Sequence, residues 1–212
     1  MAPKPTFTTI MLVRHGVTAT TGSVLPGRAA GLHLAERGVA QAAAVAERLA
    51  ELDRRPVAIY VSPLERARET AAPIAKALRL RASVDRGLLE CDFGAWTGKR
   101  LSLLQKKVEW RSVQHAPSTF RFPEGESFAQ MQQRMWATLE KLAARHARRT
   151  IVVVSHADPI KAAVTYALGV PLDLFQRTVI STCSVSAIAL TGGAPVVLCV
   201  NNTGSLRELI AS

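Results

Sequence analysis

Three short apolar runs, each ending abruptly at polar residues, constrain the fold of this chain most. They cover residues 9–13, 57–61 and 151–154, and each has the length of a buried strand rather than of a helix. The second and third are followed directly by segments that open helices, so strand and helix alternate. Strands covered on both faces by helices form parallel sheets, whose ligands bind at the carboxyl ends of the strands. We therefore expect an α/β fold with functional residues just after these runs.

Residues suited to binding and attacking a phosphate group follow the runs. Arg14, His15 and Gly16 end the first: a guanidinium binds phosphate oxygens, a neutral imidazole is a nucleophile, and glycine lets the backbone turn sharply and approach a ligand closely. Arg66 lies where a helix opens after the second run, and His156 where a helix opens after the third. Helix N-termini add backbone donors and a dipole that favours an anion. The combination predicts a site for phosphate chemistry.

Glu90 adds a carboxylate from a glycine-rich loop over residues 89–98 that also holds two aromatic side chains. A partly apolar setting raises the pKa of a carboxyl group and keeps it protonated, as a general acid requires. Taken one at a time, these residues have plainer interpretations. Arg66 is then a charge on a helix surface, His156 a strand-end histidine with satisfied hydrogen bonds, and Glu90 a loop carboxylate.

In order and spacing, these segments resemble those of the histidine phosphatase superfamily, in its phosphoglycerate-mutase-like branch with the Arg-His-Gly signature. The resemblance runs from Thr9 to about Phe175 and so covers most of the chain. Within this branch, the chain is most similar to a bacterial subgroup of probable phosphomutases and broad-specificity phosphatases, through residues 90–98, 121–127 and 173–177.

The resemblance implies a three-layer α/β/α sandwich with a mostly parallel central sheet, built as a single domain over residues 1–212. It also implies that the irregular segment 97–126 is a cap insertion over the site. The pattern of apolar and turn residues agrees with an alternation of strands and helices. It predicts a loop over 18–33, helices over 36–52, 64–80, 127–147 and 159–168, a short strand over 81–84, and a terminal hairpin of 184–190 with 195–200.

The resemblance also implies the catalytic roles. His15 resembles the nucleophile that becomes phosphohistidine. Arg14, Arg66 and His156 resemble the groups that bind the phosphoryl oxygens and stabilise the charge of the transition state. Glu90 resembles the general acid that protonates the leaving alkoxide and then deprotonates the attacking water.

Three further residues complete the predicted substrate-binding set. Arg28 aligns with a Gly-Arg pair that the family often has after the first loop, where it is either a substrate ligand or structural. Thr21 stands where the family commonly has asparagine, and a shorter donor there weakens contact with phosphate or substrate. Ala157 stands where the family usually has glycine, and its methyl group is unfavourable if the backbone needs a positive φ or a close approach to the ligand. These departures bear on rate and specificity more than on reaction class.

The resemblance thus implies a phosphomonoester hydrolase that acts on a small phosphorylated metabolite through a phosphohistidine intermediate. A phosphoglycerate-type phosphomutase shares this core, but mutases exclude water, usually with longer insertions and a tail over the site. Here the predicted cap is compact and the segment after the hairpin is brief, which favours hydrolysis. A weakly active module that binds phospho-ligands or nucleic acid is the alternative from another class. The net charge of +11 and the departures at Thr21 and Ala157 motivate it, and the intact catalytic set argues against it.

Composition limits the kinds of partner, cofactor and compartment that we expect for this chain. The 27 basic residues are scattered rather than clustered, which indicates a solvated basic surface and argues against a nucleic-acid partner. No apolar run reaches the roughly 18 residues that span a membrane, and the N-terminus has no secretory signal. Three unpatterned cysteines favour neither a disulfide framework nor a zinc site. We expect a cytoplasmic enzyme that needs no metal and no cofactor; a homo-oligomer stays open.

Overall fold

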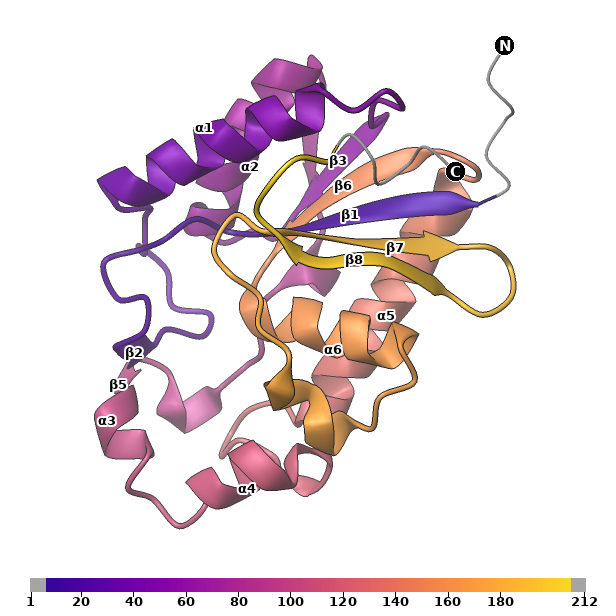
Figure 1. Ribbon diagram of the computed structural model, residues 1–212. Coiled ribbons are helices and arrows are strands. Elements are labelled where there is room, and N and C mark those ends of the chain that lie inside the picture. Colours follow the sequence, from indigo (N-terminus) through magenta and orange to yellow (C-terminus); the bar gives the residue numbers. More distant parts are fainter. Residues whose placement is uncertain (1–6, 207–212) are drawn as a thin grey trace.

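The computed structural model describes residues 7–206, whose centre is a six-stranded sheet in the order β4-β3-β6-β1-β7-β8 (Figure 1). The first four strands in this order pair in parallel, whereas β7 is antiparallel to β1 and to β8. The strands are β1 (Thr8–Arg14), β3 (Ala58–Val61), β4 (Ala82–Val84), β6 (Thr150–Ser155), β7 (Val185–Leu190) and β8 (Val196–Asn202). The mostly parallel sheet and the terminal hairpin are confirmed.

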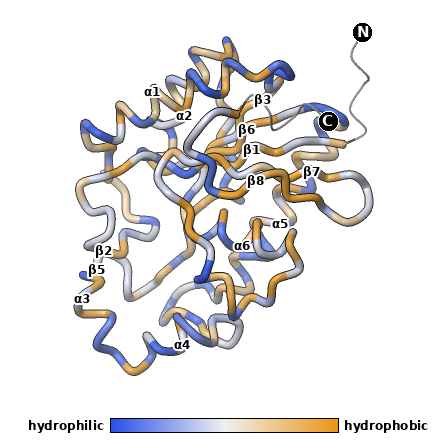
Figure 2. The backbone as a smooth tube through the Cα atoms, in the orientation of Figure 1, coloured by the Kyte–Doolittle hydropathy of each residue, from blue (hydrophilic) through white to orange (hydrophobic). Residues whose placement is uncertain are grey.

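Helices cover both faces of the sheet, because the apolar strands have no polar face. Successive side chains of a strand point to opposite faces. Accordingly, Met11 and Val13 of β1 pack with α1 (Glu36–Ala50) and α2 (Glu65–Leu78). Ile10 and Leu12 pack with α5 (Phe128–Arg145) and α6 (Ala157–Ala167) on the other face. Figure 1 shows these pairs on opposite sides, and Figure 2 shows hydrophobic residues gathered along the central strands. The three-layer sandwich is therefore confirmed.

Helix bounds agree with the sequence pattern to within two residues. Ser127 caps α5 as expected: its hydroxyl accepts from Gln130 N, and the Gln130 side chain accepts from Ser127 N. The largest difference at a helix start is at α6, which begins at Ala157, two residues before the predicted start, and so has Pro159 in its first turn. Proline is tolerated at this third position because the first N–H groups of a helix have no intrahelical acceptor.

An aromatic cluster forms a third core, to which the predicted cap segment 97–126 itself contributes. Phe93, Trp96, Phe120 and Phe122 pack with ring centroids 4.8–5.6 Å apart. Figure 1 shows α3 and α4 set apart from the main sheet. The short elements of this region are β2 (Val24–Leu25), η1 (Arg86–Leu88), η2 (Gly94–Trp96), β5 (Lys99–Arg100), α3 (Leu101–Leu104), α4 (Trp110–His115), η3 (Pro117–Thr119) and η4 (Leu172–Arg177). Across residues 7–206, no helix is long and apolar enough to cross a membrane.

Candidate active site

His15 follows the last residue of β1 and is held in one tautomer. Its Nδ1–H donates to the Gly16 carbonyl at 2.7 Å; a carbonyl can only accept, so the proton belongs to Nδ1. The other ring nitrogen, Nε2, accepts from Arg66 Nε at 3.3 Å. Burial, reinforced by the charge of Arg66, lowers the pKa of His15 to about 3. At neutral pH this side chain is therefore an uncharged imidazole with a lone pair on Nε2.

Two guanidinium groups, one buried and one partly buried, provide the positive charge of the site. Arg66, in the first turn of α2, is fully buried and donates from Nη2 to the Gly27 carbonyl at 2.8 Å. Arg14 donates from Nη1 to the Ile180 carbonyl at 2.7 Å. Among the described residues, Arg66 Nη1 and Arg14 Nε have no hydrogen-bond partner. Burial lowers the pKa of both groups, but arginine stays charged in proteins. Buried cationic donors without partners are suited to an anion.

His156 caps α6 at the end of β6 and faces His15. The ring centroids are 5.2 Å apart, and His156 Nε2 is hydrogen-bonded to Ser62 Oγ at 2.7 Å. Its Nδ1 is buried and has no partner within residues 7–206. Burial, followed by the charge of Arg66, lowers the pKa of His156 well below its ordinary value, so the ring is neutral. The sequence analysis assigned no role to Ser62, although this serine directly follows the second apolar run.

Glu90 is buried at the same site with a strongly altered acidity. Its Oε1 accepts from the Cys91 N–H at 2.9 Å. Burial and the nearby charge of Asp158 raise the pKa of Glu90 to about 7, although Arg66 and Arg14 oppose the shift. Both protonation states are therefore populated near neutral pH, as a group that first donates and then accepts a proton requires. The sequence analysis predicted a raised pKa from the apolar setting, but it did not connect Asp158 with Glu90.

The structure also defines the contacts or the backbone conformation of the three remaining predicted site residues. The Thr21 hydroxyl accepts from Thr18 N–H at 2.9 Å and fixes a turn. Ala157 is the first residue of α6 and does not have a positive φ, so its methyl group causes no backbone strain there. Arg28 contacts the Glu90 carbonyl and two acidic side chains. The substrate-binding roles of all three stay predictions.

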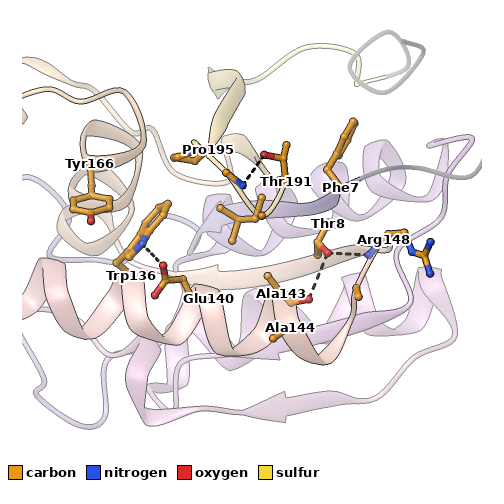
Figure 3. A pocket seen from close by; sticks show the side chains of 14 residues that line it. Phe7, Thr8, Trp136, Glu140, Ala143, Ala144, Arg148, Tyr166, Thr191 and Pro195 are labelled. Atoms are coloured by element: carbon orange, nitrogen blue, oxygen red, sulfur yellow. Dashed lines mark hydrogen bonds between the residues drawn. The ribbon is translucent and has the colours of Figure 1, made fainter.

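A hollow lies at the end of β1 that is opposite to Arg14 and His15. It is lined by residues that include Phe7, Thr8, Trp136 and Tyr166, and Figure 3 shows the Trp136 Nε1–H donating to Glu140 at 2.9 Å. Thr8 begins β1 whereas Arg14 ends it, so this hollow is separate from the paired histidines and arginines. Within residues 7–206, no three His, Cys, Asp or Glu side chains are grouped so that they hold a metal ion.

A neutral, buried imidazole beside one buried and one partly buried guanidinium group is suited to binding and attacking a phosphoryl group. The comparisons agree. The model of the histidine phosphatase superfamily (branch 1) matches residues 10–203. This chain is therefore a member of the histidine phosphatase superfamily, branch 1. The resemblance, the fold class and the enzyme class expected from the sequence are confirmed at this level.

Named relatives cover nearly the whole chain. The chain is 34% identical over 205 residues to phosphoserine phosphatase 1 of Hydrogenobacter thermophilus, with 94% of each protein covered. It is 30% identical over 181 residues to the probable phosphoglycerate mutase GpmB of Erwinia tasmaniensis, covering 84% of this chain and 83% of that protein. The solved structure of YhfR from Bacillus stearothermophilus matches with a TM-score of 0.86 at 26% identity, covering 93% of this chain and 98% of that one.

Proposed function

We propose that this histidine phosphatase hydrolyses a small phosphorylated metabolite through a phosphohistidine on Nε2 of His15. The observation that carries the proposal is the fixed tautomer: Nδ1 donates to the Gly16 carbonyl, so the lone pair is on the nitrogen that faces Arg66. A nucleophile must be unprotonated, and the pKa of about 3 keeps His15 neutral next to two cations.

The reaction has two steps. First, His15 Nε2 forms a bond to phosphorus while the bond to the leaving oxygen breaks, and the Glu90 carboxyl gives its proton to that oxygen. Arg14, Arg66 and His156 contact the phosphoryl oxygens and stabilise their developing charge. Second, the Glu90 carboxylate takes a proton from water, the water oxygen bonds to phosphorus, and the N–P bond breaks. Inorganic phosphate leaves and both side chains return to their starting states.

Hydrolysis is favoured over mutase chemistry by the relatives as well as by the compact predicted cap. The phosphoserine phosphatase is more similar and covers more of the chain than the phosphoglycerate mutase does. The named relative makes phosphoserine the first compound to test in a panel of small phosphomonoesters. A mutase would return the phosphoryl group to its product, whereas a hydrolase releases inorganic phosphate.

We infer a cytoplasmic site of action from the thiols. Cys91, Cys183 and Cys199 are free, as is usual in a reducing compartment. Burial raises the pKa of the Cys91 and Cys199 thiols, which keeps them protonated and unreactive.

The decisive test is substitution of the nucleophile. His15→Ala should lower phosphate release by several orders of magnitude, because a covalent nucleophile is lost. Wild-type enzyme quenched during turnover should have an acid-labile, alkali-stable phosphate on His15, and the variant should have none. The control is His146→Ala at the opposite end of β1, where the His146 carbonyl accepts from Thr8 Oγ1 at 3.3 Å. Near wild-type turnover in His15→Ala would exclude the mechanism.

A further inference from the structure

Two arginines that take no part in the chemistry above hold the main chain around Glu90. Arg134, on α5, donates from Nη1 to the carbonyls of Gly87 and Leu89 at 2.7 and 3.0 Å. Its Nη2 donates to the Glu90 carbonyl at 3.4 Å. Arg28 donates from Nε to the same Glu90 carbonyl at 2.9 Å. The backbone of the candidate general acid is thus contacted by guanidinium groups from two distant segments.

One carboxylate joins the two arginines. Glu126 accepts from Arg134 Nε and Nη2 at 2.8 and 2.9 Å in a bidentate pair, and it contacts Arg28 Nη2 at 2.9 Å. It also accepts from the Asp92 N–H at 3.1 Å, two residues beyond Glu90. The three side chains are only 19–28% exposed, so these charge-assisted bonds are poorly screened by solvent. We refer to Arg28, Glu126 and Arg134 as the clamp.

The main chain next to the clamp contacts the phosphate side of the site. Gly27, the neighbour of Arg28, accepts from Arg66 Nη2 at 2.8 Å. Gly27 therefore contacts Arg66, the proposed phosphate ligand, and the adjacent Arg28 contacts the main chain of Glu90, the proposed proton donor. Their backbone has little freedom: Gly27 has φ +51°, and a Cβ there would lie 2.8 Å from Thr97 Oγ1.

We propose that the clamp positions the Glu90 carboxyl relative to the phosphoryl group, so that its three members are positioning residues for proton transfer. The inference rests on the proposed function. Within the described chain, the hydrogen bond given to the Glu90 carboxyl comes from the adjacent Cys91 N–H, so the carboxyl is located mainly by its own main chain. Misplacement by about 1 Å lowers catalysis roughly 100-fold, and the clamp contacts prevent such a shift.

The test compares leaving groups in Arg134→Met, which keeps the length of the side chain and removes its charge and donors. An alkyl phosphate needs a proton as its bond breaks, so kcat/KM should fall roughly 10- to 100-fold. An activated aryl phosphate needs little proton transfer, so its phosphoenzyme burst rate should change less than about threefold. The pH dependence of the alkyl reaction should also change, because a displaced Glu90 loses part of its burial.

The matched control is Lys141→Met, which removes the same charge from the same helix and breaks an exposed ion pair with Asp85. It should leave both rates unchanged. Glu126→Gln, which keeps the shape of the side chain, should likewise lower the alkyl rate much more than the aryl burst rate. This variant tests the positioning role if a thermal unfolding assay shows that Arg134→Met does not fold. Equal losses on both substrates would overturn the positioning role. A wild-type enzyme without a burst or a label on His15 would instead overturn the proposed function.

Discussion

At the residue scale, burial decides the protonation state of each proposed catalytic group, and it shifts the pKa values of imidazole and carboxyl groups in opposite directions. His15 and His156 lose their charged forms, since desolvation and the neighbouring guanidinium groups both lower the pKa of an imidazole. Glu90 is kept protonated by desolvation and by Asp158, even though the same cations favour its ionised form. An uncharged imidazole and a substantial fraction of protonated Glu90 thus coexist at neutral pH.

These shifts predict a specific pH profile for kcat/KM on an alkyl phosphate. Above pH 7, Glu90 ionises, and the rate should fall about tenfold per pH unit as the general acid disappears. On the acid side, the rate should persist well below pH 6.5, because His15 stays neutral until the pH approaches its pKa of about 3.

Glu90→Gln supplies the control for that profile. It should abolish the alkaline limb and lower the alkyl rate by roughly two to four orders of magnitude, with a much smaller effect on the aryl phosphoenzyme burst. An alkaline limb that survives in Glu90→Gln would assign the proton to another group, with Asp92 and Asp158 as the next candidates.

At the scale of elements, the turn after β1 is fixed by close contact with α1 and α2. Gly16 N–H donates to Thr70 Oγ1 on α2, and Val17 N–H donates to Gln41 Oε1 on α1, both at 3.0 Å. Gly38 on α1 lies so close that a Cβ there would be 2.1 Å from the Val17 carbonyl oxygen. The catalytic turn therefore depends on a helix that contributes no catalytic group.

Gly38→Ala should therefore lower the free energy of unfolding, whereas a change from glycine to alanine in a helix usually raises it. Alanine in a helix normally stabilises by about 1 kcal/mol relative to glycine. Here the methyl group would displace backbone next to His15, so we expect a loss of roughly 1–3 kcal/mol in unfolding free energy and a lower kcat. Gly193→Ala, where the nearest atom is Thr191 Oγ1 at 3.8 Å, should leave both quantities unchanged. Denaturant unfolding and steady-state kinetics would measure them, and a more stable, fully active Gly38→Ala would contradict this account.

At the scale of the whole molecule, the proposed mechanism takes its positive charge from arginines that the sheet and α2 bring together. We therefore expect activity on an aryl phosphate to be unchanged after treatment with EDTA and dialysis. Vanadate, which mimics the five-coordinate phosphoryl group, should inhibit competitively. Loss of activity on chelation with recovery on adding a divalent ion would refute the assignment of Arg14 and Arg66 as the charge-stabilising groups.

The sequence by itself determined the layered fold and the place of the site. Strands without a polar face require helices on both sides, and the carboxyl ends of parallel strands meet at one edge. Arg14, His15 and His156 therefore converge without any further information. The helix bounds were less exact, and α6 starts two residues before Pro159, because a proline fits any position in the first helical turn.

Only the tertiary structure decided how these groups are tuned. The hydrogen bonds of Ser62 with His156 and of Arg28 and Arg134 with the Glu90 carbonyl join segments that are far apart in the chain, and so does the electrostatic effect of Asp158 on Glu90. No local spacing encodes them. Tautomers and pKa values depend on burial and on neighbouring charges, which exist only once the chain has folded.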